Sequence, residues 1–214
     1  MPPTGLRGRL SSGFHVTLGY WAGPIFSSHG LLVIETDHLR LVPHTGDQLL
    51  ALIEQPDRYV QLSGFTAATG LREFFVSDEV SEAFLTSLRS LHGSDPWRLG
   101  FAVVDQGSGA VIGSGGFKGP PDLAGMVEIA YGIVPEFQGR GYATEVARAL
   151  VRYAIESGLV RTVRAHTLPS PNASTKVLKK CGFDFIGEVI EPDDGLVWRW
   201  ELPAPEPEGR DSQT

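Results

Sequence analysis

The sequence is poor in the residues that form disulfides and metal sites. Cys181 is its only cysteine, so the chain can form no disulfide within itself and contains no four-cysteine zinc framework. Its six histidines are scattered and show neither HExxH nor HxxxH spacing. We therefore expect no bound metal ion and a reducing, cytoplasmic setting.

Long hydrophobic runs and an excess of positive charge are also lacking. No run approaches the roughly 18 apolar residues of a membrane span, and histidine, glycine and proline interrupt the apolar residues near the N-terminus before a signal-peptide core forms. The net charge of −7 argues against broad binding of nucleic acids, which needs a basic face. These absences predict a protein that binds neither membranes nor nucleic acids.

Both ends of the 214-residue chain have the composition of extensions. Residues 1–30 are rich in glycine, serine and proline without a clear period, and residues 203–214 are polar and proline-rich. A composition of 42% hydrophobic and 20% charged residues is typical of a globular protein. We expect a single domain over residues 31–202.

The hydrophobic pattern between these ends predicts alternating strands and helices. The clearest element is a helix that starts after Gly141 and ends at Gly158, with apolar residues at the three- and four-residue spacing of one buried face. The other expected helices are 46–54, 77–91 and 172–180, and the expected strands are 31–42 with a break at Thr36-Asp37, 101–104, 110–112, 127–134, 162–168, 183–190 and 197–202. This order predicts an α+β fold with a mixed, mostly antiparallel twisted sheet, flanking helices and one central strand-loop-helix-strand unit.

A glycine-rich turn in that unit is the strongest candidate for a binding site. In Gln138-Gly139-Arg140-Gly141-Tyr142-Ala143, the glycines let the backbone approach a ligand, and the N–H groups from about Gly139 to Thr144 favour an anion at the start of the helix. Arg140 can add charge-assisted hydrogen bonds. The turn matches neither the Rossmann fingerprint nor a P-loop, and taken alone it is also consistent with a plain tight connection.

The surroundings of this turn resemble the acyl-CoA motif of the GNAT superfamily of N-acetyltransferases. The family consensus Gln/Arg-x-x-Gly-x-Gly/Ala is matched by Gln138, Gly141 and Ala143, after a strand that ends in Pro135-Glu136. A later helix ends in Val177-Leu178-Lys179-Lys180-Cys181-Gly182-Phe183, as in family members. The resemblance spans roughly residues 33–202 and looks closest to the branch of ribosomal-protein N-terminal acetyltransferases.

This resemblance implies a GNAT-like fold and the direct transfer of an acetyl group from acetyl-CoA, a co-substrate, to a primary amine in a ternary complex. The acceptor would be a peptide N-terminus, an amino acid or another small amine. The residues implied to bind the co-substrate are Ile133 and Val134 along the pantetheine arm, then Gln138, Gly139, Arg140, Gly141, Tyr142, Ala143 and Thr144 around the pyrophosphate, and Asn172 beside the arm. A catalytically silent acyl-CoA-binding module is the alternative.

Acyl transfer to an amine needs a base for the amine proton and a proton for the departing thiolate. Glu128 lies where some family members hold a catalytic glutamate, although it can equally bind a substrate cation or pair with Arg164. Ser174 lies where relatives often place a serine near the CoA sulfur, but Ser174 or Asn172 can instead be a helix N-cap. Tyr131 is expected on the face of its strand opposite Glu128, so Ser174 remains the candidate proton donor.

The resemblance also suggests where the acceptor binds. The acceptor pocket of the family corresponds to Phe65, Phe74, Phe75, Trp97 and the loop 118–121, with core packing as the alternative for each aromatic residue. A strand edge near residues 197–200 can pair two subunits, or Trp198 and Trp200 can simply pack within the sheet, so a monomer and a homodimer both remain open.

Overall fold

A single sheet runs through the computed structural model, which describes residues 25–26, 32–76, 82–91, 93–192 and 194–205. The strands are β1 (Ile25–Phe26), β2 (Leu32–Glu35), β3 (Leu39–Pro43), β4 (Phe101–Asp105), β5 (Val111–Phe117), β6 (Met126–Ile133), β7 (Thr162–Thr167), β8 (Asp184–Glu191) and β9 (Gly195–Pro203). They form a nine-stranded sheet in the order β1-β2-β3-β4-β5-β6-β7-β9-β8. Only β6 and β7 pair in parallel; every other neighbouring pair is antiparallel.

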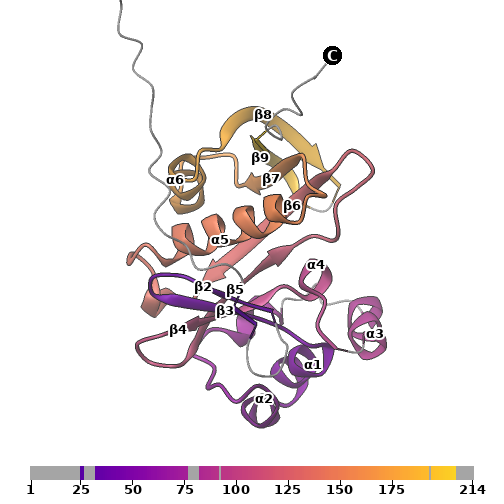
Figure 1. The fold of residues 1–214 in the computed structure, drawn as a ribbon, viewed down its shortest axis with the longest axis vertical. Helices are drawn as coiled ribbons and strands as arrows, with labels where there is room; N and C mark the ends of the chain where they lie inside the picture. Colours follow the sequence, from indigo (N-terminus) through magenta and orange to yellow (C-terminus); the bar gives the residue numbers. More distant parts are fainter. Residues whose placement is uncertain (1–24, 27–31, 77–81, 92, 193, 206–214) are drawn as a thin grey trace, which may run out of the picture.

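Helices pack around this sheet. They are α1 (Gly46–Glu54), α2 (Pro56–Ser63), α3 (Glu82–Ser90), α4 (Pro96–Leu99), α5 (Tyr142–Glu156) and α6 (Ala173–Lys180). Figure 1 shows α1 to α4 gathered around one half of the molecule, α6 beside the β7–β9 half, and α5 lying between the two halves. None of these described helices has the length and apolarity needed to cross a membrane.

The structure confirms the predicted α+β class and the order of the predicted elements. The strand expected at 31–42 is broken into β2 and β3, and the unit around the glycine-rich turn is β6, α5 and β7. The first part of the helix expected at 77–91 lies outside the described residues, and its remainder is α3. The short helices α2 and α4 were not predicted. Pro56 follows the end of α1 and starts α2, because proline lacks only an N–H group that the first helical position does not use.

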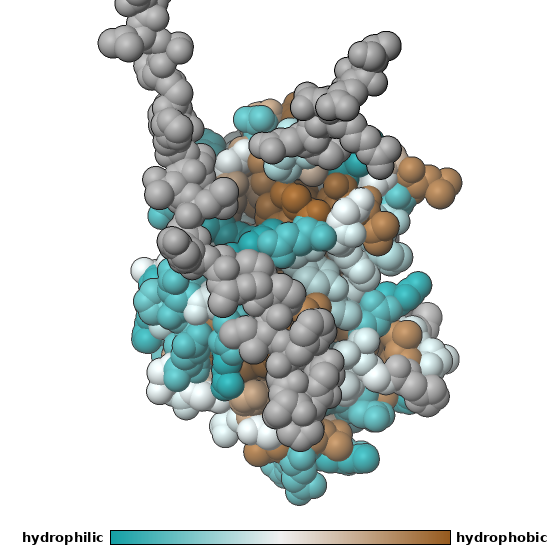
Figure 2. Space-filling view, in the orientation of Figure 1, coloured by the Kyte–Doolittle hydropathy of each residue, from teal (hydrophilic) through white to brown (hydrophobic). Residues whose placement is uncertain are grey.

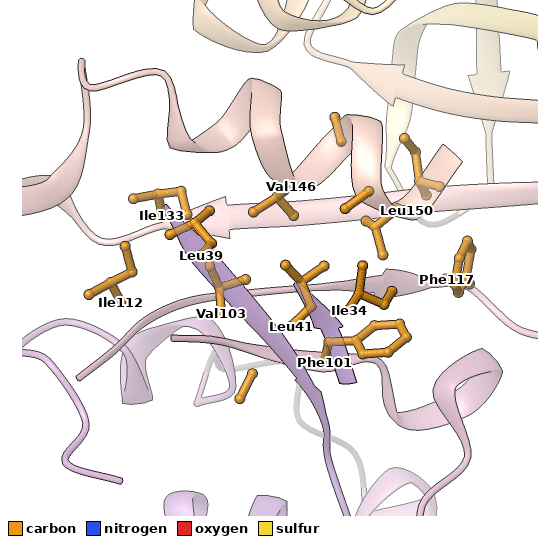
Figure 3. Close-up of a cluster of buried hydrophobic side chains, with 14 of the residues drawn as sticks. Ile34, Leu39, Leu41, Phe101, Val103, Ile112, Phe117, Ile133, Val146 and Leu150 are labelled. Carbon is orange, nitrogen blue, oxygen red and sulfur yellow. The ribbon is translucent and has the colours of Figure 1, made fainter. Parts of the chain in front are cut away.

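The core lies where α5 packs on the sheet. Figure 3 shows Val146 and Leu150 pointing from α5 toward Leu41 and Val103 of the sheet, and all four side chains are buried. Burying such aliphatic side chains stabilises the fold by about 1.5–3 kcal/mol each. The apolar stripe of α5 therefore fixes this helix, and with it the loop at its N-terminus, against the central strands.

A glycine in β5 lets the two central strands approach closely. A Cβ atom added to Gly113 would lie 2.3 Å from the carbonyl oxygen of Gly132 in β6, a distance at which the backbone would have to move. The position of β6 beside β5 therefore depends on the missing side chain at Gly113.

The open edge of the sheet differs from the expected one. The edge predicted near residues 197–200 belongs to β9, which pairs with β7 on one side and β8 on the other. The outer strand is β8, where Phe185, Ile186 and Ile190 are exposed. In the view of Figure 2, the largest hydrophobic area likewise lies in the half that contains β7 to β9.

Candidate active site

The two parallel strands at the centre of the sheet diverge. β6 pairs with β7 only from Met126 to Glu128, opposite Thr162 to Arg164, although β6 continues to Ile133 and β7 to Thr167. Beyond this register β6 pairs with β5, and β7 pairs with β9. A gap therefore opens between the two strands after Glu128.

The backbone of β6 offers hydrogen-bonding groups to this gap. The N–H group of Val134 donates to the carbonyl oxygen of Ile112 in β5 (2.9 Å). Because successive backbone groups of a strand point to opposite sides, the N–H group of Ile133 faces away from β5, into the gap. Of the two residues expected to pair with a pantetheine arm, Ile133 is thus the better placed, and Val134 is engaged within the sheet.

The glycine-rich turn borders a cavity of about 490 Å³ at the end of this gap. Gly139 and Gly141 have φ angles of 76° and 89°, which glycine adopts without strain, and open space surrounds the position of a Cβ atom at both. The cavity is lined by the turn and the start of α5 (Gln138, Gly139, Gly141, Tyr142, Ala143, Thr144), by Phe74, by the end of β6 (Tyr131, Gly132, Ile133) with Phe137, and by α6 (Ala173, Ser174, Lys176, Val177, Lys180). We call it the donor cavity.

The start of α5 presents backbone N–H groups to the donor cavity. The N–H groups of Thr144 and Glu145 donate to the carbonyl oxygen of Gly141 (3.0 and 3.1 Å). Those of Tyr142 and Ala143, at the first two helical positions, have no acceptor within the helix. Together with the positive end of the helix dipole, they can bind an anion. The amide expected from Thr144 is instead used inside the helix.

Three side chains of the turn brace the loop. The Gln138 amide donates to the carbonyl oxygen of Ile133 (2.8 Å), and the Tyr142 hydroxyl donates to Asp105 (3.1 Å). Arg140 donates to the carbonyl oxygen of Glu136 (3.0 Å) and stacks over Phe137. Arg140 therefore turns away from the donor cavity, which it does not line, while its backbone remains part of the turn.

At α6 the structure gives Asn172 and Ser174 different positions. Asn172 is the N-cap: its side chain accepts from the N–H group of Thr175 (3.0 Å), and its amide donates to the carbonyl oxygen of Ser170 (3.0 Å). Ser174 lies in the first turn and lines the donor cavity, whereas Asn172 does not. The Ser174 hydroxyl forms no hydrogen bond within the part of the chain that the structure describes.

Glu128 lies in a second cavity, of about 270 Å³, at the start of the gap. Its Oε1 atom is 2.8 Å from Nζ of Lys118 and 3.1 Å from Nδ1 of His166. Lys118 also reaches Asp194 (3.1 Å). Although burial opposes the charge, hydrogen bonds to Glu128 and Asp194 raise the pKa of Lys118 above its usual value. Arg164, the partner considered for Glu128, pairs with Glu201 instead (2.7 Å).

Tyr131 and Ser174 connect these two cavities, because both residues line each of them. The Tyr131 hydroxyl is buried and has no hydrogen-bond partner within the described residues. Burial raises the pKa of this phenol well above its usual value. A buried hydroxyl without a partner is costly, so a ligand group that pairs with it would gain stability.

A third cavity, of about 490 Å³, lies along β6 beside the α1 and α4 half of the molecule. It is lined by Phe74 and Phe75, two of the residues suggested for the acceptor pocket. The other two aromatic residues pack elsewhere: Trp97 lies against Phe117 and Tyr153, and Phe65 lies beneath Arg40.

Sequence reasoning missed His166 and Asp194 as members of the site and mentioned Lys118 only as part of a loop. One available signal was the alternation of β7, which places Arg164 and His166 on one face. Only the parallel register of β6 with β7 brings that face beside Glu128.

These features fit a long, flexible ligand with an anionic end, such as acetyl-CoA. The positive-φ glycines leave room for phosphates, and the unpaired edge of β6 offers amide partners to a pantetheine arm. The Tyr131 hydroxyl, where the cavities meet, has no hydrogen-bond partner among the described residues. Among the described residues, no group of three or more His, Cys, Asp or Glu side chains is arranged to hold a metal ion.

Comparison with known proteins yields relatives of one kind. A curated relative, the uncharacterized N-acetyltransferase YjdG of Bacillus subtilis, is 26% identical over 155 residues, which cover 72% of this chain and 90% of YjdG. Among solved structures, the ribosomal-protein-S5-alanine acetyltransferase of Vibrio fischeri is similar with a TM-score of 0.55 at 14% identity, covering 82% of this chain and 98% of that protein. RimL, the ribosomal L7/L12 alpha-N-protein acetyltransferase, in complex with coenzyme A, has a TM-score of 0.56 at 14% identity, covering 80% and 97%.

The sequence model of the acetyltransferase (GNAT) domain matches residues 38–184, which is more than half of the chain. This match includes β6, the glycine-rich turn, α5 and the start of α6 that border the donor cavity. The chain therefore belongs to the GNAT acetyltransferase family and is an acetyl-CoA-dependent N-acetyltransferase.

Proposed function

We propose that this protein transfers the acetyl group of acetyl-CoA directly to a primary amine while both substrates are bound. The observation that carries the proposal is the gap between β6 and β7, which lies between the donor cavity and the cavity of Glu128. Tyr131 and Ser174 line both cavities, so a thioester and an amine can meet there without passing through a covalent enzyme intermediate.

In this proposal the turn from Gln138 to Ala143 holds the pyrophosphate through backbone N–H groups, and Ile133 pairs with the pantetheine arm. Bound acetyl-CoA supplies an activated thioester carbonyl. The side chains of Gln138 and Tyr142 act indirectly, because they brace the strand end and the loop. Asn172 contributes by starting α6 at the position that brings Ser174 to the cavity.

Glu128 is the proposed general base. Its side chain is only 15% exposed, yet it lines the cavity in which the amine would lie. A carboxylate there can accept the ammonium proton directly or through a water molecule. Asp194 also lines this cavity, so its two carboxylates outnumber the one lysine, Lys118, and the cavity suits a cationic acceptor.

Ser174 is the proposed proton donor for the departing thiolate. Its hydroxyl lies in the first turn of α6 and faces the donor cavity without a partner in the described structure. Tyr131 is the competing donor, since its hydroxyl is buried at the same junction.

The acceptor is proposed to be an α-amine, as in a peptide N-terminus or an amino acid. An α-amine with a pKa of about 8 is roughly one-tenth neutral at pH 7, whereas a lysine amine near 10.4 is neutral less than about a thousandth of the time. The fold similarity to enzymes named for ribosomal-protein acetylation supports a peptide N-terminus, but the cavities also accommodate smaller amines.

Two measurements test the proposal. Titration with acetyl-CoA, followed by calorimetry, should give saturable binding, and a free-thiol assay across matched α- and ε-amines should show faster release with the α-amines. A clear preference for ε-amines would refute the acceptor class. Binding without thiol release over the whole panel would favour a catalytically silent acyl-CoA-binding module.

A further inference from the structure

His166 lies beside the proposed base and lines the same cavity. It belongs to β7, its side chain is 5% exposed, and its Nδ1 atom lies 3.1 Å from Oε1 of Glu128. The contact lacks the alignment of a finished hydrogen bond, and Nδ1 has no other partner among the described residues.

The other side of the ring determines where its proton resides. Arg199 of β9 approaches with Nε 3.3 Å from Nε2 of His166, and its guanidinium also pairs with Glu191 of β8 (3.0 Å). An arginine can only donate, so its contact favours Nε2 as the unprotonated, accepting nitrogen, although Oε1 of Glu191 also lies 3.4 Å from Nε2. In that arrangement the proton of a neutral His166 lies on Nδ1, on the side of Glu128.

The contacts at Glu128 are unevenly divided between its two oxygens. The closest contacts of Lys118 and of His166 to Glu128 are both at Oε1. Donors that converge on one carboxylate oxygen fix the rotation of the group and leave the other oxygen with its lone pairs available. Held in this way, Oε2 is the oxygen that can receive a proton from an amine in the cavity.

We propose that His166 is a positioning residue for acyl transfer: its Nδ1–H group, anchored through Arg199 and Glu191, holds Oε1 of Glu128 so that Oε2 faces the acceptor amine. The inference rests on the proposed role of Glu128 as base. The charged groups around the ring are Glu128 from β6, Glu191 from β8 and Arg199 from β9. No bond to His166 is made or broken; the proton of the amine goes to Glu128.

Two substitutions distinguish the Nδ1–H group of His166 from its contact with Arg199. His166→Asn places its terminal amide near the position of Nδ1 and can still donate to Glu128, whereas His166→Gln reaches toward the position of Nε2 and keeps only the contact with Arg199. With an amine that the wild type acetylates, His166→Gln should lower kcat about tenfold or more, and His166→Asn should stay within about threefold. Acetyl-CoA affinity and melting temperature should change little in both.

A double variant tests whether His166 acts through Glu128. In the Glu128→Gln background, His166→Gln should cause almost no additional loss of kcat, because the group that it positions is already absent. Equal losses in the Asn and Gln variants, an unaffected Gln variant, or losses that multiply in the double variant would each overturn the inference.

A spectroscopic measurement on the wild type covers the case in which the Gln variant does not fold. Nitrogen-15 NMR of the imidazole should show that the neutral form of the ring is protonated on Nδ1. A neutral form protonated on Nε2 would overturn the inference. Failure of the proposed function is a different result: the wild type would then release no thiol with any amine, whatever the tautomer of His166.

Discussion

Glu128 and Arg164 form the last register pair between β6 and β7, and the two strands separate beyond it. The pair thus marks the point at which a continuous sheet becomes an open site. Because the proposed base, Glu128, is itself the last paired residue, its position relative to the cavities depends on where this parallel ladder ends.

Gly141→Val should weaken acetyl-CoA binding by at least about tenfold while the protein remains folded. The φ angle of 89° costs a side-chain-bearing residue about 1–2 kcal/mol, and the new side chain would stand beside the first-turn amides of α5. Calorimetric titration with CoA measures the loss. Gly158→Val is the matched control, because Gly158 has a φ of 71°, lies in open space and follows the opposite end of α5. Equal affinities in both variants and the wild type would remove the turn from the donor site.

Ser174→Ala should lower kcat about tenfold or more with little change in the dissociation constant of acetyl-CoA, because it removes the proposed proton donor and no structural hydrogen bond. Stopped-flow measurement of thiol release gives both parameters. Tyr131→Phe is the comparison, since it removes a hydroxyl from the same junction. A larger loss of kcat in Tyr131→Phe would transfer the acid role to Tyr131.

Acidification should destabilise the protein through His44. This side chain is 1% exposed, its ring nitrogens have no hydrogen-bond partner in the described structure, and burial lowers its pKa to about 4 from 6.5. The unfolded chain therefore binds the proton more readily, so the free energy of unfolding should fall as the pH drops from about 6.5 to 4, by up to about 3 kcal/mol. Urea unfolding across this range should show a flatter dependence in His44→Leu. An unchanged slope in that variant would contradict the assignment.

Gly113→Ala should destabilise the fold by about 1–3 kcal/mol, because its Cβ atom would collide with the carbonyl oxygen of Gly132 across β5 and β6. Chemical denaturation measures the change. Gly107→Ala is the control: its added Cβ atom would meet Asp105 at an ordinary 3.5 Å, so stability should stay within about 0.5 kcal/mol. A neutral Gly113→Ala variant would show that β6 can shift without cost.

Local sequence patterns predicted most of the secondary structure and the glycine-rich turn that borders the donor cavity. The three- and four-residue spacing of apolar residues in α5 and the glycines at 139 and 141 depend on backbone conformation and on one buried face, and both can be recognised in a short stretch of sequence. For the same reason the family resemblance was visible, since it rests on contiguous motifs around Gln138 and Gly182.

Only the tertiary structure determined which partners these side chains contact. Asn172 caps α6, Arg140 turns back onto Phe137, and Glu128 pairs with Lys118 and His166 rather than with Arg164. These partners lie on different strands and loops, so their contacts depend on strand register and rotamers that long-range packing selects. The sequence by itself determined that a GNAT-like fold with a glycine-rich turn before α5 would form. The divergence of β6 from β7, and the surroundings of Glu128, arose only when distant strands were paired.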